Sequence, residues 1–301
     1  MKKNDLTFCI ADQYIHLHFP EGVDGRNYVY TFGPFYVKEA KKPLMFDMEI
    51  GENLDDTSPC KRVVRENCNV NGNKYHIYWT DDGGYKIIIH FLKEELSAIM
   101  VSNADFTKCR VSLFGDDNIR SFGLNNAIMV AYAFSGCFHN ILLFHSSVIL
   151  HDGKGYCFLG KSGTGKSTHS DLWMKYVPDC EILNDDNPAV VANEDGTMRV
   201  YGTPWSGKRD FYKQKNVPIG AFVRLEQAPE NSIERENVLP AFAALISSVS
   251  SMVWDKPTYD RIVELCNRLV GHVPVWHLKN RPDEECLRMS YEHCTGKKFP
   301  E

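Results

Sequence analysis

The stretch from 160 to 168 combines glycine, lysine and hydroxyl side chains at the spacing of a phosphate-binding loop. Residues 160–167 read GKSGTGKS, a full match to the pattern G-x4-G-K-[ST]. Glycines let such a loop curl until its N–H groups converge on phosphate oxygens, and a helix that begins near Lys166 directs the positive end of its dipole at the same point. Lys166 is then expected at the β- and γ-phosphates of ATP, with the Ser167 hydroxyl on Mg²⁺. The predicted nucleotide-binding residues are Gly160, Ser162, Gly163, Thr164, Gly165, Lys166, Ser167 and Thr168.

Two neighbouring carboxylates, Asp185 and Asp186, follow the next predicted strand. Because the carboxyl ends of adjacent strands in an open α/β sheet share a crevice, we expect both acids to face the bound phosphates. One carboxylate can hold Mg²⁺ while the other orients or deprotonates a hydroxyl. The alternative is a plain turn, since 184–188 has turn composition. The phosphate loop upstream favours the site.

The elements that must position these groups alternate in the second half of the chain. An apolar run at 156–159 predicts a buried strand that leads into the loop, followed by a helix over 167–176 and a strand over 181–184. The other predicted strands lie at 141–149, 189–192, 198–201, 219–226 and 273–278, and the other predicted helices at 238–252, 259–270 and from about 282. This order indicates an α/β (α+β) fold in which helices flank a mixed sheet.

The first half of the chain is rich in strand patterns. Strands are predicted at 14–19, 74–80, 85–91, 96–101 and 109–114, which together indicate an antiparallel β-sheet module. A helix over 125–135, with Asn125 as its cap, is predicted to join this module to the second half. The predicted domains are therefore a β-rich N-terminal domain over 1–123 and a nucleotide-binding domain over 124–301.

Two histidines, His16 and His18, stand two residues apart in the first of these strands. Alternate residues of a strand share one face, so both rings are expected on the same side of the sheet. They offer a metal ion two ligands without a third. An ordinary pair on the sheet surface is the favoured interpretation.

The composition excludes several classes of partner. The 301 residues carry a net charge of −5, whereas binding to nucleic acid or an anionic membrane needs a basic face. The ten cysteines include no C-x-x-C pair, and the first residues contain no apolar core of a secretion signal. A cytoplasmic protein with reduced thiols is predicted, with small molecules or proteins as partners. The sequence leaves open whether the chain forms a homo-oligomer.

The motifs in their order resemble the C-terminal catalytic domain of HPr kinase/phosphorylase, which belongs to the phosphoenolpyruvate-carboxykinase-like class of P-loop folds. The resemblance rests on the loop G-x-S-G-x-G-K-S, on a strand with His145 just upstream and on the Asp185–Asp186 pair downstream. In the carboxykinase, a His-Cys-Ser strand similarly precedes a loop G-x-S-G-T-G-K-T and then a Gly-Asp-Asp. The segments 202–208 and 274–285 also look like HPr-kinase-related proteins that are associated with peptide-modification systems. The resemblance covers about 141–290.

The resemblance implies a role for each matching residue. Lys166 and Ser167 match the phosphate lysine and the metal hydroxyl. One of Asp185 and Asp186 matches the general base and the other a metal-associated carboxylate. Asp185 is favoured as the base, so that Asp186 would hold the metal together with Ser167. His145 matches an active-site histidine that contacts a phosphate or a metal-bound water, although a hydrogen-bonded structural histidine is the alternative.

Two cations, Lys208 and Arg209, follow a predicted strand in a glycine-containing loop, where they could clamp the transferred phosphoryl group or stay as solvated surface charges. One position departs from the family. HPr kinases have a metal-binding glutamate three residues before a glycine of the later strand, and Arg199 stands at that position before Gly202. The departure argues against binding of HPr itself and against the reverse phosphorylase reaction.

These features predict a cytoplasmic, Mg²⁺-dependent kinase that transfers the γ-phosphoryl group of ATP to a hydroxyl, either a serine of a protein or peptide or a small molecule. One alternative is a nucleotide-binding regulatory or peptide-recognition module without catalysis. Another is a phosphoenolpyruvate-carboxykinase-like activity, but the chain is too short for the full substrate domain of that enzyme. The presence of Asp185, Asp186 and His145 favours the kinase.

Overall fold

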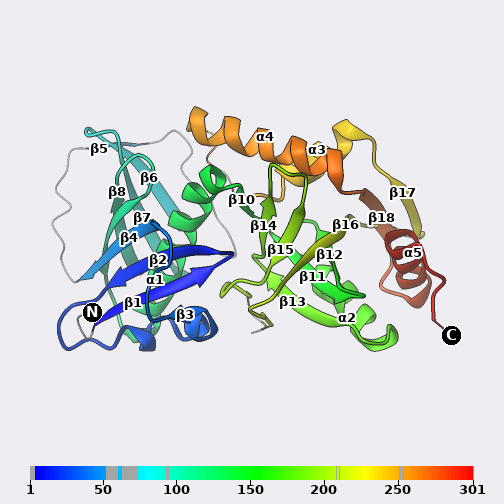
Figure 1. Ribbon diagram of the computed structural model, residues 1–301, viewed down its shortest axis with the longest axis horizontal. Helices are drawn as coiled ribbons and strands as arrows, with labels where there is room; N and C mark the ends of the chain where they lie inside the picture. The colour runs from blue at the N-terminus through cyan, green and yellow to red at the C-terminus, as the bar shows by residue number, and fades with distance from the viewer. Residues whose placement is uncertain are drawn as a thin grey trace. The chain divides into compact units, whose positions relative to one another are not determined.

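A computed structural model of the chain describes residues 4–51, 60–62, 74–92, 95–207, 209, 211–250, 252 and 254–300 (Figure 1). The chain forms two compact units, Met1–Gly136 and Cys137–Glu301. Each unit contains a nine-stranded sheet, so the fold is mixed α/β. The units divide after Gly136, whereas the sequence predicted a division after residue 123; the difference is the helix between these positions, which packs on the first sheet.

The first unit is built on a mixed sheet. Its strands are β1 (Asp5–Ile10), β2 (Gln13–His18), β3 (Tyr36–Val37), β4 (Leu44–Gly51), β5 (Cys60–Arg62), β6 (Lys74–Thr80), β7 (Tyr85–Phe91), β8 (Glu95–Ser102) and β9 (Lys108–Leu113), in the order β3-β1-β2-β4-β9-β8-β7-β6-β5. The β6–β7 hairpin has the predicted bounds. The prediction of an antiparallel sheet is wrong for its centre, because β4 pairs in parallel with both β2 and β9. Strand β4 was not predicted, and neither were β1, β3 and β5.

Helix α1 (Asp117–Gly136) covers one face of this sheet (Figure 1). It begins at Asp117 rather than at Asn125, and the Asp116 carboxylate accepts hydrogen bonds from the N–H groups of Asn118 and Ile119 at 3.0 Å. Asn125 therefore lies inside the helix and is not its cap. The side chains that α1 buries against the sheet recur with helical spacing: Leu124, Ala127, Ile128, Ala131 and Tyr132. Short 3₁₀ helices lie at η1 (Gly25–Asn27), η2 (Tyr30–Phe35) and η4 (Cys137–His139), the last in the second unit.

The second unit has a mixed sheet flanked by four helices. Its strands are β10 (Ile141–Leu143), β11 (Ser146–His151), β12 (Lys154–Leu159), β13 (Glu181–Asp186), β14 (Ala189–Ala192), β15 (Met198–Tyr201), β16 (Asn216–Gln227), β17 (Ser232–Arg235) and β18 (Val275–Asn280). The helices are α2 (Lys166–Tyr176), α3 (Val238–Ile246), α4 (Lys256–His272) and α5 (Glu284–Thr295). The predicted β14–β15 hairpin is confirmed, whereas α3 ends earlier than predicted and β17 was not predicted. Within the described residues, no helix is long and apolar enough to cross a membrane.

Both faces of the central strands are buried, each against its own pair of helices (Figure 1). In β12, Cys157 and Leu159 point to the core that includes α3 and α4. The alternate residues Tyr156 and Phe158 point to the core that includes Trp173 of α2 and the residues of α5. Burial of such a side chain contributes about 1.5–3 kcal/mol. The strand that leads into the loop is therefore held on both sides.

One edge of the central sheet gathers the predicted site. Strand β11 pairs antiparallel with both β12 and β13, so β12 and β13 end on the same side of the sheet and β11 begins there, between them. Ser146 at the start of β11 lies opposite both Leu159 and Asp186. The prediction that the loop strand and the aspartate strand are adjacent is thus wrong, although their ends do share one edge.

The single strand predicted over 141–149 is broken at Phe144 and His145. Before the break β10 pairs with β14, and after it β11 pairs with β12 and β13. At the break, the His145 N–H donates to the Ser248 carbonyl at 2.7 Å. The change of partner places His145 at the start of β11, on the same edge as the phosphate loop.

His169, on α2, ties that helix to α5 and carries a pH-dependent contribution to stability. Its Nε2 lies 2.9 Å from Ser290 Oγ, and Trp173 Nε1 donates to the same nitrogen at 3.3 Å. Complete burial lowers the pKa of His169 to about 3. The unfolded chain therefore binds one more proton than the folded chain between about pH 6.5 and about pH 3.

The free energy of unfolding is expected to fall by about 1.4 kcal/mol per pH unit through this one group as the pH drops below about 6.5. Urea unfolding of the wild type and of His169→Gln at a series of pH values measures the contribution, because the variant lacks the titrating ring. The exposed His272, at the end of α4, supplies the control His272→Gln, which is expected to keep the wild-type slope. Parallel slopes for wild type and His169→Gln would contradict the prediction.

Candidate functional site

The loop between β12 and α2 has the conformation that its glycines permit. Gly165 has a φ of 97° with nothing within 4 Å of the position of a Cβ, so the backbone conformation itself requires glycine. A Cβ on Gly160 would lie 2.4 Å from Thr164 Oγ1, which bonds to the Lys161 carbonyl at 2.8 Å. Outside the loop, Gln227 Nε2 donates to the Gly163 carbonyl at 3.1 Å. The loop is therefore held both from within and from β16.

Helix α2 begins at Lys166 without a side-chain cap. The N–H groups of the first turn of a helix have no carbonyl partner within the helix, and the helix dipole adds positive potential at the same end. A phosphate is the ligand that such an end binds best.

Lys166 is connected to the downstream aspartates through His145. Its Nζ donates to the Gly160 carbonyl at 2.8 Å and contacts His145 Nε2 at 2.9 Å, and His145 Nδ1 lies 3.0 Å from Asp186 Oδ1. Because an ammonium only donates, His145 Nε2 accepts from Lys166 and the Nδ1–H donates to Asp186. Burial lowers the pKa of Lys166, and the charges of Asp186 and Asp185 oppose this shift.

Asp185 is the buried member of the aspartate pair, with 8% of its surface exposed. Both carboxylate oxygens lie 3.4 Å from Ser167 Oγ, and Arg209 Nε donates to Oδ2 at 2.6 Å. Arg209 Nη1 also donates to Asp171 Oδ1 at 2.6 Å, on α2. Its Nη2 is buried and has no hydrogen-bond partner among the residues that the structure describes. A buried N–H without an acceptor in the protein is suited to an anionic ligand.

The two aspartates have different neighbours. Asp185 lies beside Ser167, and a hydroxyl with a carboxylate is a ligand pair that Mg²⁺ prefers. Asp186 contacts His145, and Asn187 Nδ2 donates to its second oxygen at 2.8 Å. The structure thus brings Ser167 together with Asp185, whereas the sequence analysis had paired Ser167 with Asp186. The donor set fits a phosphate group with its divalent cation.

The two cations that the sequence predicted for the site, Lys208 and Arg209, differ in what the structure shows of them. Arg209 lies in the site, while Lys208 falls outside the described residues. Arg199, the departure from the family pattern, donates from Nε to Asn216 Oδ1 at 2.6 Å.

A cavity of about 210 Å³ adjoins the loop on the side of β16 and β18. Asn280, at the end of β18, is buried, and its Oδ1 has no hydrogen-bond partner within the described part of the chain. Neither Asn280 nor Gln227 was predicted from the sequence, because only the sheet order brings the ends of β16 and β18 beside the loop. The cavity is lined by Thr164, Gly165, Thr168, His169, Gln227, Ala228, Asn280, Arg281 and Pro282.

Comparison of the chain with models of protein families gave no match, and a search among curated proteins gave none either. The described part of the chain brings Lys166, Ser167, His145, Asp185, Asp186 and Arg209 together through the contacts given above.

Proposed function

We propose that the second unit is an ATP-dependent phosphotransferase that uses Mg²⁺ and transfers the γ-phosphoryl group to a hydroxyl. More particularly, we propose a kinase similar to HPr kinase that phosphorylates a serine of a protein or peptide, or a small-molecule hydroxyl. One observation carries the proposal: the ammonium of Lys166 and the hydroxyl of Ser167 lie at the same sheet edge as two carboxylates, next to a buried arginine N–H that has no partner among the described residues. This combination supplies each type of group that phosphoryl transfer needs.

The order of the strands supports one orientation of the nucleotide. Across the sheet the order is β18, β16, β12, β11 and β13, with the phosphate loop at the end of β12. The cavity lies on the β16–β18 side of the loop, and Asp185 and Asp186 lie on the other side. The nucleoside would occupy the cavity, and the γ-phosphoryl group would point to the aspartates.

The contacts suggest that one aspartate binds the metal and the other accepts a proton. Asp185 with Ser167 would hold Mg²⁺, which supplies positive charge to the phosphates when bound. Asp186, 27% exposed and oriented by the His145 Nδ1–H, would accept the proton of the acceptor hydroxyl. The bond from the γ-phosphorus to the β–γ bridging oxygen breaks as the bond to the acceptor oxygen forms. Lys166 and Arg209 would offset the charge that leaves with ADP.

The proposal is tested by calorimetry with ATP and Mg²⁺ and by transfer of labelled phosphate. HPr, free serine and any small peptide encoded beside this gene are the acceptors to try. Saturable binding of ATP with Mg²⁺ and label on a hydroxyl are expected. If the folded chain takes up no ATP in the presence of Mg²⁺, the proposal is wrong.

Replacement of Asn280 by alanine tests the orientation of the nucleotide. The Oδ1 of Asn280, which has no partner among the residues described, can accept a hydrogen bond from an amino group of the base. Asn280→Ala is expected to weaken ATP binding by about tenfold, the effect of one hydrogen bond of about 1–1.5 kcal/mol. Affinity for inorganic triphosphate, which has no base, is expected to stay unchanged. An equal loss of affinity for ATP and for triphosphate would show that the base does not contact Asn280.

A nucleotide-binding module without catalysis is the second candidate. The observation that favours it is Arg199, a cation at the position of the family's metal-binding glutamate. This candidate predicts ATP binding without turnover on any acceptor. Turnover that disappears in an Asp186→Asn variant with unchanged ATP affinity would exclude it.

A further inference from the structure

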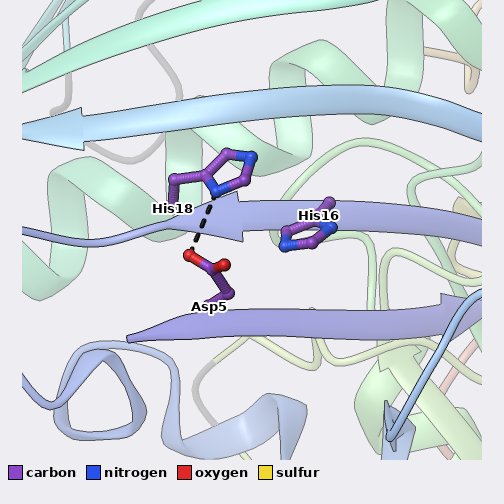
Figure 2. A group of neighbouring side chains, drawn as sticks. All are labelled: Asp5, His16 and His18. Atoms are coloured by element: carbon purple, nitrogen blue, oxygen red, sulfur yellow. Dashed lines mark hydrogen bonds and ion pairs between the residues drawn. The ribbon is translucent and has the colours of Figure 1, made fainter. Parts of the chain in front are cut away.

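A second cluster of polar side chains lies on the sheet of the first unit, where Asp5 of β1 faces His16 and His18 of β2 (Figure 2). Asp5 is directly opposite His18 in the antiparallel ladder, and His16 is two residues away on the same face. One potential ligand atom from each of the three residues lies within 4.8 Å of the others. The third ligand that the histidine pair lacked in the sequence is thus supplied by a neighbouring strand.

His18 lies between two carboxylates. Its Nδ1 is 3.1 Å from Asp5 Oδ1, and its Nε2 is 2.7 Å from Asp47 Oδ1. A protonated ring can donate to both carboxylates, whereas a neutral ring can donate to only one. A metal ion that binds Nδ1 would take the place of the proton between this nitrogen and Asp5 (Figure 2). The Nε2–H would still donate to Asp47.

Asp47 is placed to orient the His18 ring without binding the metal itself. It accepts the Nε2–H of His18, and Lys108 Nζ donates to its other oxygen at 3.1 Å. A histidine that binds a metal through one nitrogen almost always donates its other N–H to a carboxylate, a carbonyl or water, which fixes the ring. His18 with Asp47 has this arrangement.

His16 contributes the second ring. It stacks on His18 with 4.4 Å between ring centroids, and its Nε2 is buried without a hydrogen-bond partner within the described part of the chain. Among the residues that the structure describes nothing satisfies this nitrogen, and a metal ion would do so.

We propose that Asp5, His16 and His18 bind a divalent transition-metal ion of the Zn²⁺ type. Two imidazoles and one carboxylate match the ligands of such ions, whereas Mg²⁺ and Ca²⁺ prefer oxygen alone. His18 is 41% exposed, so solvent reaches the site and water fills the remaining coordination positions.

Titration of the metal-free full-length chain with Zn²⁺, followed by calorimetry, tests the site. Asp5→Asn, His16→Gln and His18→Gln are each expected to remove one equivalent of bound Zn²⁺, and bound Co²⁺ is expected to lose its visible d–d bands in the same variants. His76→Gln, on β6 of the same sheet, is the matched control and is expected to bind as the wild type. Mg²⁺ is expected not to compete.

Two further measurements distinguish the loss of a metal ligand from a general loss of folded protein. Asp47→Asn leaves all three ligands in place and is expected to weaken Zn²⁺ binding by about 10- to 100-fold. Zn²⁺ is expected to raise the melting temperature of the wild type and of His76→Gln, but not of the three ligand variants, because only a ligand that binds the folded state stabilises it. The proposal is overturned if the wild type binds no Zn²⁺, if the three ligand variants bind as many equivalents of Zn²⁺ as the wild type, or if Mg²⁺ displaces Zn²⁺.

Discussion

Lys166→Met is expected to weaken the binding of ATP with Mg²⁺ by about 10- to 100-fold. Hydrogen bonds from a charged group contribute about 1.5–3 kcal/mol each, and every 1.4 kcal/mol changes affinity about tenfold. Phosphoryl transfer is expected to slow by a further 100- to 1000-fold or so, because the ammonium offsets charge that develops only in the transition state. Calorimetry and single-turnover transfer of labelled phosphate separate the two effects.

Lys161, an exposed lysine in the same loop, supplies the matched control. Lys161→Met makes the same change of charge and volume and is expected to keep both affinity and turnover within about twofold, since a lone surface charge contributes little. The thermal unfolding of Lys166→Met is expected to occur no lower than that of the wild type, because burial already disfavours the ammonium. Equal effects of the two substitutions would remove Lys166 from the phosphate site.

The parts that the sequence predicted best are those whose conformation depends on nearby residues. The loop over 160–167 is fixed by its own glycines and by the strand and helix on either side. The hairpin of β6 and β7 has the predicted bounds because its turn, 81–84, combines aspartate and glycine between two alternating runs. In both cases the controlling interactions lie within a few positions of each other.

The parts that the sequence left undetermined depend on the order of strands. No local pattern indicates that β11 inserts between β12 and β13, yet that insertion brings His145 between Lys166 and Asp186. The second cluster shows the same dependence. His16 and His18 were evident as a pair, but Asp5 joins them only through the β1–β2 ladder, and β1 was not predicted.

The choice between the two aspartates also depends on three-dimensional detail. Neighbouring residues of a strand point to opposite sides, so the register of β13 decides which carboxylate meets Ser167. The contacts of Asp185 with Ser167 and Arg209 favour metal binding, and those of Asp186 with His145 favour proton transfer. The resemblance to HPr kinase left the two roles open between these residues, and the sequence favoured Asp185 as the base. Substitution of each aspartate by asparagine separates the two assignments.

Asp185→Asn is expected to remove the dependence of ATP affinity on Mg²⁺ and to reduce phosphoryl transfer by at least about 100-fold, because asparagine keeps the shape of the side chain but lacks the charge that holds the cation. Affinity for ATP without Mg²⁺ is expected to stay the same or to rise, since Arg209 is released from Asp185 to bind phosphate. Calorimetry at a series of Mg²⁺ concentrations measures both.

Asp171 provides the control for Asp185, since it makes the other ion pair of Arg209 from the exposed surface of α2. Asp171→Asn is expected to leave the Mg²⁺ dependence intact, because Asp171 is bonded to the guanidinium and not to Ser167. Asp186→Asn is expected to leave both ATP affinity and its Mg²⁺ dependence intact while transfer is lost. If Asp186→Asn abolishes the Mg²⁺ effect and Asp185→Asn does not, Asp186 holds the metal and Asp185 is the base. The side chain that meets Ser167 in the free protein would then have to exchange places with its neighbour when the nucleotide binds.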